Sequence, residues 1–452
     1  MLTSIPRDSE MRSLALLLGM VGLLPMAMMR PIVGVIIFDW ISFMNPQQEA
    51  WGMAASVPWA LLAAIATIIG CVFVGEPRRL PVNSTTILLM LFIVLVTIST
   101  MLALGPPEVV NPWYIMMVKS FLYMLIVAAL LIDQKRVHAL VWTMVISLGY
   151  YGVKGGAFTV LTHGNNHVYG AANSMISDNN QLAVALLISL PLMNFLRLQS
   201  SHKIIKIGLI IAMMLTLFAI VGTYSRGALL GLGAVSAFLW WNSKGRIRSG
   251  IMIAVGLVLA VSIMPADWTA RMHTISSYQK DESAESRLTV WKEAFGMAAA
   301  RPLTGAGFRS TATPTVLHRY YPDATPRAVH SIWFEVLSEN GFPAFFVWVA
   351  MQIVGLVNVR RIRKLARGDP SLAWADDLAR MCQVSIIAFL VGGSFLSLAY
   401  YDFYFTILII LASTRMMLER AKVPAIQTTR QRSAESIAMA QAVSWRMRRD
   451  VP

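Results

Sequence analysis

Long apolar runs, separated by short polar and basic stretches, follow one another along almost the whole chain. Many of these runs have the length, roughly 20 residues, at which an α-helix crosses the hydrocarbon core of a bilayer. A lone apolar segment in lipid satisfies its backbone hydrogen bonds as a helix. The pattern therefore predicts about twelve transmembrane helices: 13–29, 54–74, 86–104, 114–132, 138–154, 181–198, 205–224, 228–241, 251–265, 331–357, 381–399 and 403–418.

The composition agrees with this pattern. Hydrophobic residues make up 56% of the 452 positions and charged residues only 13%, whereas a soluble protein carries about 25% charged residues. We therefore expect an all-α polytopic membrane protein, with one integral membrane domain over residues 1–418. The first apolar run follows basic residues like a signal peptide but lacks a small-residue cleavage site, so we interpret it as an uncleaved span.

Basic residues occur in short clusters between the apolar runs, as in loops that face the cytoplasm. Counting spans between clusters places every cluster on one side and predicts that both termini are cytoplasmic. These clusters are Arg78-Arg79, Lys135-Arg136, Lys203/Lys206, Lys244/Arg246/Arg248 and Arg360-Arg361/Arg363-Lys364.

Residues 31–44 do not fit this count. They are apolar but short for a span, contain Asp39, and as a crossing would place Arg78-Arg79 outside. We therefore predict a re-entrant or interfacial segment there.

The net charge of +15 does not indicate nucleic acid, because no nucleic-acid-binding motif accompanies it and clustered basic residues also attract anionic lipid. The basic tail, residues 419–452, is expected to be cytoplasmic and to contact lipid headgroups. Cys71 and Cys382 both lie within apolar spans, so a disulfide between them is not expected.

The predicted outer side carries an unusually long connection, residues 266–330, with a helical pattern at 285–300. Loops of this length are often functional. A second outer feature is Arg226, the single charge within 207–241. This run is long enough for two crossings, so we expect a turn at 225–227 in which Gly227 adopts a left-handed conformation. Arg226 is then either an interfacial anchor or a guanidinium that grips a phosphate.

His330 lies at the mouth of the next apolar span. Thr325 and Pro326 have the character of an N-cap and a first-turn residue, which places Arg327 and His330 on nearly the same face of a helix. The positive charge and partial burial favour a neutral imidazole, as a general base requires. The alternative is an interfacial polar residue without catalytic role.

Three further positions carry candidate chemistry. Lys154 follows a predicted span and precedes two glycines, so it either meets an anion or simply marks a turn. Asp178 and Asn180 are expected to cap the following helix. Arg287, within the long loop, is expected to be solvated or paired with Glu285 or Asp281 unless another motif supports it. No metal, nucleotide or nucleophile-elbow motif is present in the sequence.

Three segments in this order, "TYSRGALLGLG", "SRLTVWKEAFGMAAARPLTGAGF" and "AVHSIWFEVLSENGFPAFF", resemble the signature blocks of the bacterial O-antigen ligase and polymerase superfamily. The segments "FMNPQQEAWG", "GYYGVKGGAFTVLT" and "SDNNQLAVAL" look like the O-glycosylation ligase subgroup of exosortase-bearing bacteria. The resemblance covers roughly residues 10–418.

This resemblance implies a GT-C-like glycosyltransferase of the bacterial inner membrane with a periplasmic active site. Such enzymes move a glycan from undecaprenyl diphosphate to an acceptor hydroxyl, for O-antigen ligases that of lipid A–core. The essential histidine of the family matches His330, and its arginines match Arg226 and Arg287. Lys154 and the Asp178–Asn180 cluster match subgroup positions. The implied reaction is inverting and needs neither a metal ion nor another cofactor.

Other functions remain open at this point. A polymerase joins one lipid-linked glycan to another, and a protein O-oligosaccharyltransferase uses a serine or threonine acceptor. A transporter of lipid-linked glycan predicts ionisable groups along a path through the bilayer. The candidates Lys154, Arg226, Arg287 and His330 instead gather on the predicted outer side, which favours an enzyme; Arg327 is a further candidate for contacting glycan or phosphate.

Overall fold

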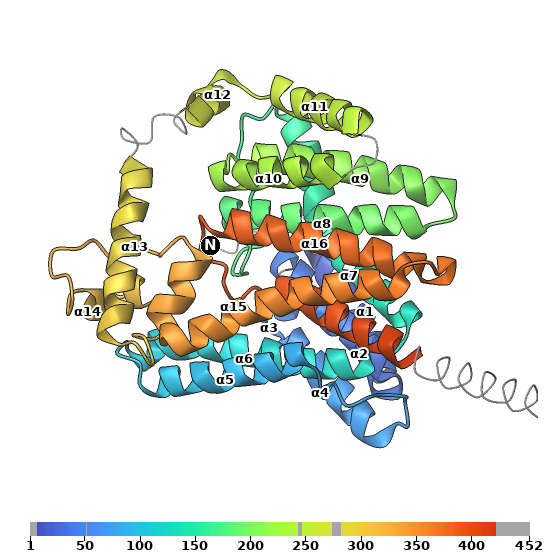
Figure 1. The fold of residues 1–452 in the computed structure, drawn as a ribbon, viewed down its shortest axis with the longest axis horizontal. Helices are drawn as coiled ribbons and strands as arrows, with labels where there is room; N and C mark the ends of the chain where they lie inside the picture. Colours follow the sequence, from blue (N-terminus) through green and yellow to red (C-terminus); the bar gives the residue numbers. More distant parts are fainter. Residues whose placement is uncertain (1–6, 51, 243–245, 274–281, 422–452) are drawn as a thin grey trace, which may run out of the picture.

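The structure, a computed structural model, describes residues 7–50, 52–242, 246–273 and 282–421, and within these ranges it contains helices and no strands (Figure 1). Seven helices are long and apolar enough to cross a membrane, which confirms a multi-span helical membrane protein. The main helices are α1 (Arg7–Met29), α2 (Pro31–Met44), α4 (Trp59–Phe73), α5 (Ser84–Met101), α6 (Pro107–Leu130), α7 (Gln134–Leu161), α8 (Asn179–Gln199), α9 (Lys203–Gly222), α10 (Arg226–Asn242), α11 (Arg246–Ser262), α12 (Ala266–His273), α13 (Glu282–Ala300), α15 (Ile332–Ala366), α16 (Ala373–Gly393) and a last helix at 402–421. Short pieces are η1 (Pro46–Glu49), α3 (Met53–Ser56), η3 (Ser310–Ala312), α14 (Pro314–Leu317) and η4 (Pro370–Leu372).

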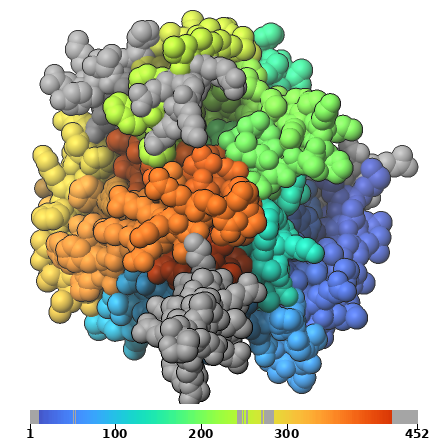
Figure 2. All heavy atoms as spheres, turned by 45° about the vertical axis from the view of Figure 1, so that its right-hand side comes forward, coloured from blue at the N-terminus to red at the C-terminus, as the bar shows by residue number. Residues whose placement is uncertain are grey.

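Helix α8 is the centre of the bundle. Its residues 182–188 are all fully buried, because α7, α9, α10 and α16 surround it. A helix that is apolar on every side is expected in such a position. On the face shown in Figure 2, the orange residues of α15 and α16 lie beside the green residues of α9, and teal residues separate them from the blue N-terminal elements. The core thus connects early and late parts of the chain.

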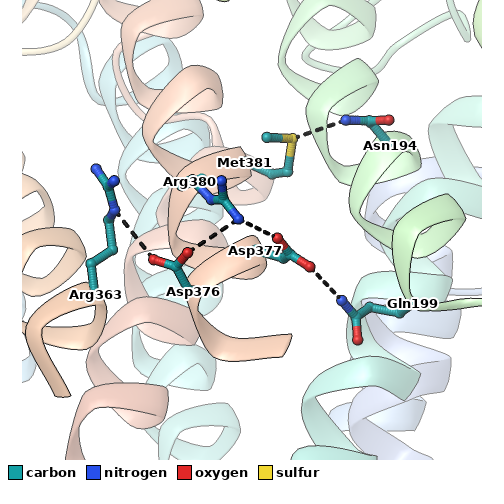
Figure 3. A network of polar contacts seen from close by, with 7 residues as sticks. All are labelled: Asn194, Gln199, Arg363, Asp376, Asp377, Arg380 and Met381. Atoms are coloured by element: carbon teal, nitrogen blue, oxygen red, sulfur yellow. Dashed lines mark hydrogen bonds and ion pairs between the residues drawn. The ribbon is translucent and has the colours of Figure 1, made fainter. Parts of the chain in front are cut away.

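The bundle has two ends. At one, called here the basic end, α15, α16 and α8 meet in a network of polar contacts (Figure 3). Asp376 accepts a hydrogen bond from Arg363 at 3.3 Å, and Asp377 accepts one from Gln199 at 3.0 Å. Arg136 likewise forms an ion pair with Glu76 at 2.8 Å. The other end, called the His330 end, contains the turns at 162–178 and 223–225 and the long loop.

Helix α2 corrects the prediction for residues 31–44. Its first turn reaches the basic end, where the Ile32 N–H donates to Glu76 at 3.1 Å. Its last turn reaches the opposite end, where the Met44 carbonyl accepts from the Tyr151 hydroxyl at 2.6 Å. A 14-residue helix suffices because more than half of its residues are buried against other helices rather than facing lipid. This segment therefore runs the whole distance between the two ends.

Because α2 runs from one end of the bundle to the other, the end at which α1 begins differs from the one that the sequence predicts. Arg12 in α1 lies 3.8 Å from Glu49, at the His330 end. Met416 of the last helix instead accepts a hydrogen bond from Asn83, at the basic end. These contacts place the start of α1 and the end of the last helix at opposite ends of the bundle, whereas the sequence predicts both termini on one side. The predicted tail beyond residue 421 lies outside the described residues, as do Lys244 and Asp281.

Helix α7 continues past the predicted end at residue 154 to Leu161. The two glycines after Lys154 are helical: a Cβ on Gly156 would lie 2.0 Å from the Leu215 carbonyl oxygen of α9. They allow α7 and α9 to approach closely instead of forming a turn. The prediction that Lys154 follows the span is wrong for this reason.

The turn between α9 and α10 also differs from the prediction. Tyr224, not Gly227, has the left-handed conformation, with φ 61°. The Tyr224 hydroxyl donates to the Gly164 carbonyl at 2.6 Å and its ring stacks on His167. These contacts stabilise the left-handed conformation at a non-glycine residue. Gly227 is needed for packing, since its Cβ would lie 3.2 Å from the Phe395 Cβ.

Within the long loop, the predicted helical segment forms α13, and the chain then docks on α15. Helix α15 is interrupted at Gly341, with φ 76° and ψ 179°. Pro343 has no N–H to donate to the Glu339 carbonyl four residues earlier. That carbonyl accepts instead from the Gly307 N–H at 2.9 Å and from the Ser99 hydroxyl at 2.9 Å. The interruption therefore anchors the end of the long loop.

Replacing Gly341 by Ala is expected to lower the stability of the protein by about 1–3 kcal/mol or more, because its φ and ψ are open essentially to glycine alone. A Cβ there would also lie 2.7 Å from the Pro302 carbonyl oxygen. The thermal unfolding midpoint in detergent measures this. Gly22→Ala in α1, where nothing lies within 4 Å, is the control and should unfold at or above the wild-type temperature. Equal midpoints for both variants would contradict a strained interruption at Gly341.

Candidate functional site

His330 stands just before α15 in a left-handed backbone conformation, with φ 51°. Helix α15 begins at Ile332 with Ser331 as its N-cap, so the prediction that a helix starts at Thr325 and Pro326 is wrong. Segment 327–331 instead lies against neighbouring loops. The His330 N–H donates to the Ser397 hydroxyl at 3.0 Å. The ring is open to the surface.

Arg327 does not share a helix face with His330 either. Its N–H donates to the Thr311 carbonyl at 3.1 Å, and its carbonyl accepts from the Thr311 hydroxyl at 2.9 Å. This two-way pairing extends the backbone, which explains why no helical turn forms there. The Arg327 charge also acts on Glu293 of α13, whose pKa is raised mainly by burial and lowered in part by this guanidinium.

The charges around His330 come from four separate segments. Partial burial lowers the pKa of His330 below its ordinary value of 6.5, and Arg287, Arg309 and Arg327 lower it further. Asp178 acts in the opposite direction. At neutral pH the imidazole is therefore uncharged and able to accept a proton. The predicted neutral state thus agrees with the surroundings, although the cations come from more segments than expected.

Arg287 is brought to His330 by α13. Trp291, one turn further along the same face of this helix, donates its indole N–H to the Val329 carbonyl at 3.0 Å. The same indole stacks on Phe334 at 5.5 Å. This contact fixes α13 beside segment 327–331. It explains how a loop arginine, which the residue pattern left as solvated or paired and the resemblance matched to a family arginine, acts on the histidine.

Arg226 is the first residue of α10, beside the start of α8. The buried Asn179 amide donates to the Thr223 carbonyl at 2.7 Å, which joins α8 to the turn before Arg226. On the other side, Gly227 lies against Phe395, whose ring is 6.4 Å from that of Trp291. These contacts hold Arg226 in the same group of elements as Arg287 and His330.

Asp178 is the N-cap of α8, as predicted: its carboxylate accepts from the Asn180 N–H at 2.8 Å. The Asn180 side chain also donates to this carboxylate, at 3.0 Å. Gln181, in the same first turn of α8, donates its side-chain amide to the Ser397 carbonyl at 2.9 Å. Asp178 and Asn180 thus lie at the start of a helix that is linked to His330 through Ser397.

Lys154 belongs to a different group of contacts. Its ammonium lies 3.1 Å from the Glu49 carboxylate and 5.3 Å from the centre of the Tyr150 ring. It is not among the charges that act on His330. The structure therefore gives Lys154 a role in joining α7 to η1, and does not bring it together with His330, Arg287 and Asp178.

Arg309 is a site residue that the sequence reasoning missed. It adopts φ 60° before η3, and its N–H donates to the Glu339 carboxylate at 2.7 Å. Its guanidinium lies 5.1 Å from the centre of the Trp113 ring. The other Glu339 oxygen accepts from Tyr400 at 2.7 Å. The sequence signal was a buried acidic residue in an apolar helix, which requires a partner.

No group of three or more histidine, cysteine or acidic side chains suited to a metal ion occurs in the part of the chain that the structure describes. The cationic side chains Arg226, Arg287, Arg309 and Arg327 instead provide an environment for an anion. Arg287, Arg309 and Arg327 act on the uncharged imidazole of His330, and Arg226 lies at the start of the neighbouring helix α10. This arrangement is suited to proton removal beside a bound phosphate or diphosphate.

Comparison with known families adds to this geometry. Residues 211–349 match the model of the O-antigen ligase family (Wzy_C), and residues 11–201 match a family of unknown function (DUF5935). No curated protein matches the chain. The chain thus carries an O-antigen ligase domain that contains Arg226, Arg287 and His330, and it is a membrane enzyme of the O-antigen ligase and polymerase type. Lys154, Asp178 and Asn180 lie in the region of unknown function.

Proposed function

We propose that this membrane enzyme, which carries an O-antigen ligase domain, transfers a glycan from undecaprenyl diphosphate to an acceptor hydroxyl of lipid A–core. The reaction takes place on the periplasmic face of the bacterial inner membrane. One observation carries the proposal: His330 is an uncharged imidazole among Arg287, Arg309 and Arg327, which act on it together. A proton acceptor beside several guanidinium groups matches what this reaction requires.

The leaving group of this reaction is a diphosphate, so no protein acid is needed to protonate it. Arg226 and Arg287 bind its negative charge, and each charge-assisted hydrogen bond contributes roughly 1.5–3 kcal/mol. His330 removes the proton from the acceptor hydroxyl as it attacks the anomeric carbon. The carbon–oxygen bond to the diphosphate breaks in the same displacement, so the configuration at that carbon inverts.

Arg309 and Arg327 support this reaction from the side of His330. Their charges help to keep the imidazole neutral, and they lie where the acceptor glycan or the diphosphate is expected to approach. Asp178 opposes them and prevents the pKa from falling further. A base whose pKa falls far below the working pH is a weaker proton acceptor, so this opposition preserves its strength.

Transfer by the purified enzyme, reconstituted with undecaprenyl-diphosphate-linked glycan and lipid A–core, is expected to continue in EDTA. The reason is that the arginines, rather than a divalent cation, neutralise the diphosphate. Glycan joined to lipid A–core is measured by gel mobility and mass spectrometry. Loss of transfer in EDTA with recovery in magnesium would contradict the proposed chemistry. Glycan added only to a second lipid-linked glycan, or only to a protein, would identify a polymerase or a protein glycosyltransferase instead.

The orientation that the proposal requires places the His330 end in the periplasm. The basic end, together with the C-terminal end of the last helix, then faces the cytoplasm. In a variant lacking Cys71 and Cys382, a cysteine at Glu285 is expected to react with an impermeant thiol reagent in intact spheroplasts. A cysteine at Arg367 should react only after permeabilisation. The reverse pattern would place the reaction on the cytoplasmic side.

The start of α1 is a more specific test of this orientation. A cysteine at Met11, near the Arg12–Glu49 contact, is expected to react from the periplasm together with Glu285→Cys. Protection of this position in intact spheroplasts would contradict the end-to-end passage of α2 and would restore a cytoplasmic start of the chain.

A further inference from the structure

A cavity of about 680 Å³ lies between α2, α4 and α6, away from the charges that act on His330. Its volume is typical of ligand pockets, which span roughly 300–1,000 Å³. Much of its lining is apolar, and several of these side chains are also exposed on the outer surface of the bundle. These are Leu61, Ile65, Ile68, Ile115 and Leu122. In a membrane this side of the cavity faces lipid chains.

The opposite wall carries polar groups. Tyr401 lines the cavity and is only 3% exposed, and its hydroxyl is buried without a hydrogen-bond partner among the described residues. Buried polar atoms without a partner are rare and unfavourable. This hydroxyl lies beneath the cavity surface, so the charge that meets a ligand comes from the exposed Lys119.

Lys119 supplies a positive charge to the same cavity. It lies near the middle of α6, where an ammonium within the membrane is unfavourable without an anionic partner. Side chains on a helix lean towards its N-terminus, which for α6 is the His330 end, where Asn45 and Gln47 line the cavity. The ammonium is thereby directed towards the polar part of the cavity.

The acidic side chain in this wall is already engaged. The Asp402 carboxylate accepts a hydrogen bond from the Ser42 hydroxyl and another from the Phe403 N–H at 2.8 Å. These bonds hold the carboxylate in place at the start of the last helix. The group that remains for an incoming ligand is the exposed Lys119 ammonium, whose charge suits an anionic head.

We propose that this cavity binds one phospholipid of the bilayer with an anionic phosphate head. Its phosphate contacts Lys119, and one acyl chain lies along α4 and α6. This lipid is separate from the glycan donor, because the cavity and the proposed active site lie against different parts of the loop at 394–402. Ser397 of this loop contacts His330, whereas Tyr401 lines the cavity. The bound lipid thus supports the loop that positions the histidine.

The test is native mass spectrometry of the delipidated full-length protein with added dioleoylphosphatidylglycerol. One tightly held lipid is expected per wild-type protein. Dioleoylglycerol, which has the same chains and no phosphate, is expected to bind at least about tenfold more weakly, as for loss of a charge-assisted contact. Equal retention of the two lipids by wild type would overturn the proposal without any variant.

Variants locate the bound lipid. Lys119→Met, which keeps an unbranched side chain, is expected to weaken phosphatidylglycerol binding about tenfold. Lys203→Met, which removes an exposed lysine at the start of α9, is the matched control and should bind like wild type. Unchanged binding in Lys119→Met would place the lipid elsewhere.

Ala64→Phe tests the apolar part by filling it from α4. It is expected to abolish lipid retention while gel filtration and circular dichroism remain those of wild type. Unchanged retention by this variant would overturn the proposed chain position. Retention of undecaprenyl phosphate with none of phosphatidylglycerol would assign the cavity to the isoprenoid carrier and would also overturn the proposal. Neither result depends on glycan transfer, so the proposed function is tested separately.

Discussion

His330→Asn is expected to lower the rate of glycan transfer by roughly 100-fold or more, the usual contribution of a general base. Expression, folding and binding of the lipid-linked glycan should stay close to wild type. Asparagine is the better replacement because position 330 has φ 51°, which Asn adopts readily, whereas other residues pay roughly 1–2 kcal/mol. His330→Ala should lose transfer too, with a greater loss of stability. Transfer is measured with purified enzyme and defined lipid substrates.

The pH dependence separates a base from a structural histidine. Because the pKa of His330 is lowered, the imidazole becomes protonated only below its ordinary titration range. Transfer should therefore rise with pH through this lowered pKa, reach a plateau above it, and lose this limb in His330→Asn. A variant that folds and transfers glycan at nearly the wild-type rate would show that His330 is not the base.

Removing a neighbouring cation and removing a neighbouring anion should shift the pH at which transfer rises in opposite directions. Arg309→Gln removes a cation that lowers the pKa of His330, so the limb should move to higher pH. Asp178→Asn removes the opposing anion, so the limb should move to lower pH. Arg319→Gln, at an exposed arginine that does not act on His330, is the control. Shifts of the same sign in the first two variants would contradict this electrostatic arrangement.

Arg226→Lys is expected to lower transfer by roughly 10- to 100-fold, because the charge is kept but the planar, two-pronged hydrogen-bonding group is lost. Stability should change little, since the residue is only half-buried at the start of α10. Steady-state transfer at several donor concentrations measures the effect. Arg367→Lys, at an exposed position of the basic end, is the control. A wild-type rate in Arg226→Lys would make the arginine an interfacial anchor only.

The sequence by itself determined the class of the fold and most of its helices. Apolar runs of membrane-spanning length have one regular solution in lipid, so the predicted spans reappear as helices with shifted ends. The N-cap at Asp178 and the helix at 282–300 were also readable, because capping and helical periodicity depend on neighbours in sequence. His330, Arg226 and Arg287 were identified through resemblance to known signature segments.

Tertiary packing decided the remaining features. Residues 31–44 pass from end to end because surrounding helices, which no local pattern reveals, replace the lipid that a longer span requires. The glycines after Lys154 became a helix contact, and the Tyr224 turn depends on Gly164 and His167, which are distant in sequence.

The site was decided in the same way. Segment 327–331 is extended because Thr311 pairs with it, although its residues have the local character of a helix start. Arg309 reaches His330 because Glu339 and the interruption at Gly341 hold the end of the long loop. Local sequence thus determined which segments are helical. Only contacts between distant segments decided which charges meet at the histidine, since electrostatic interactions act through space and not along the chain.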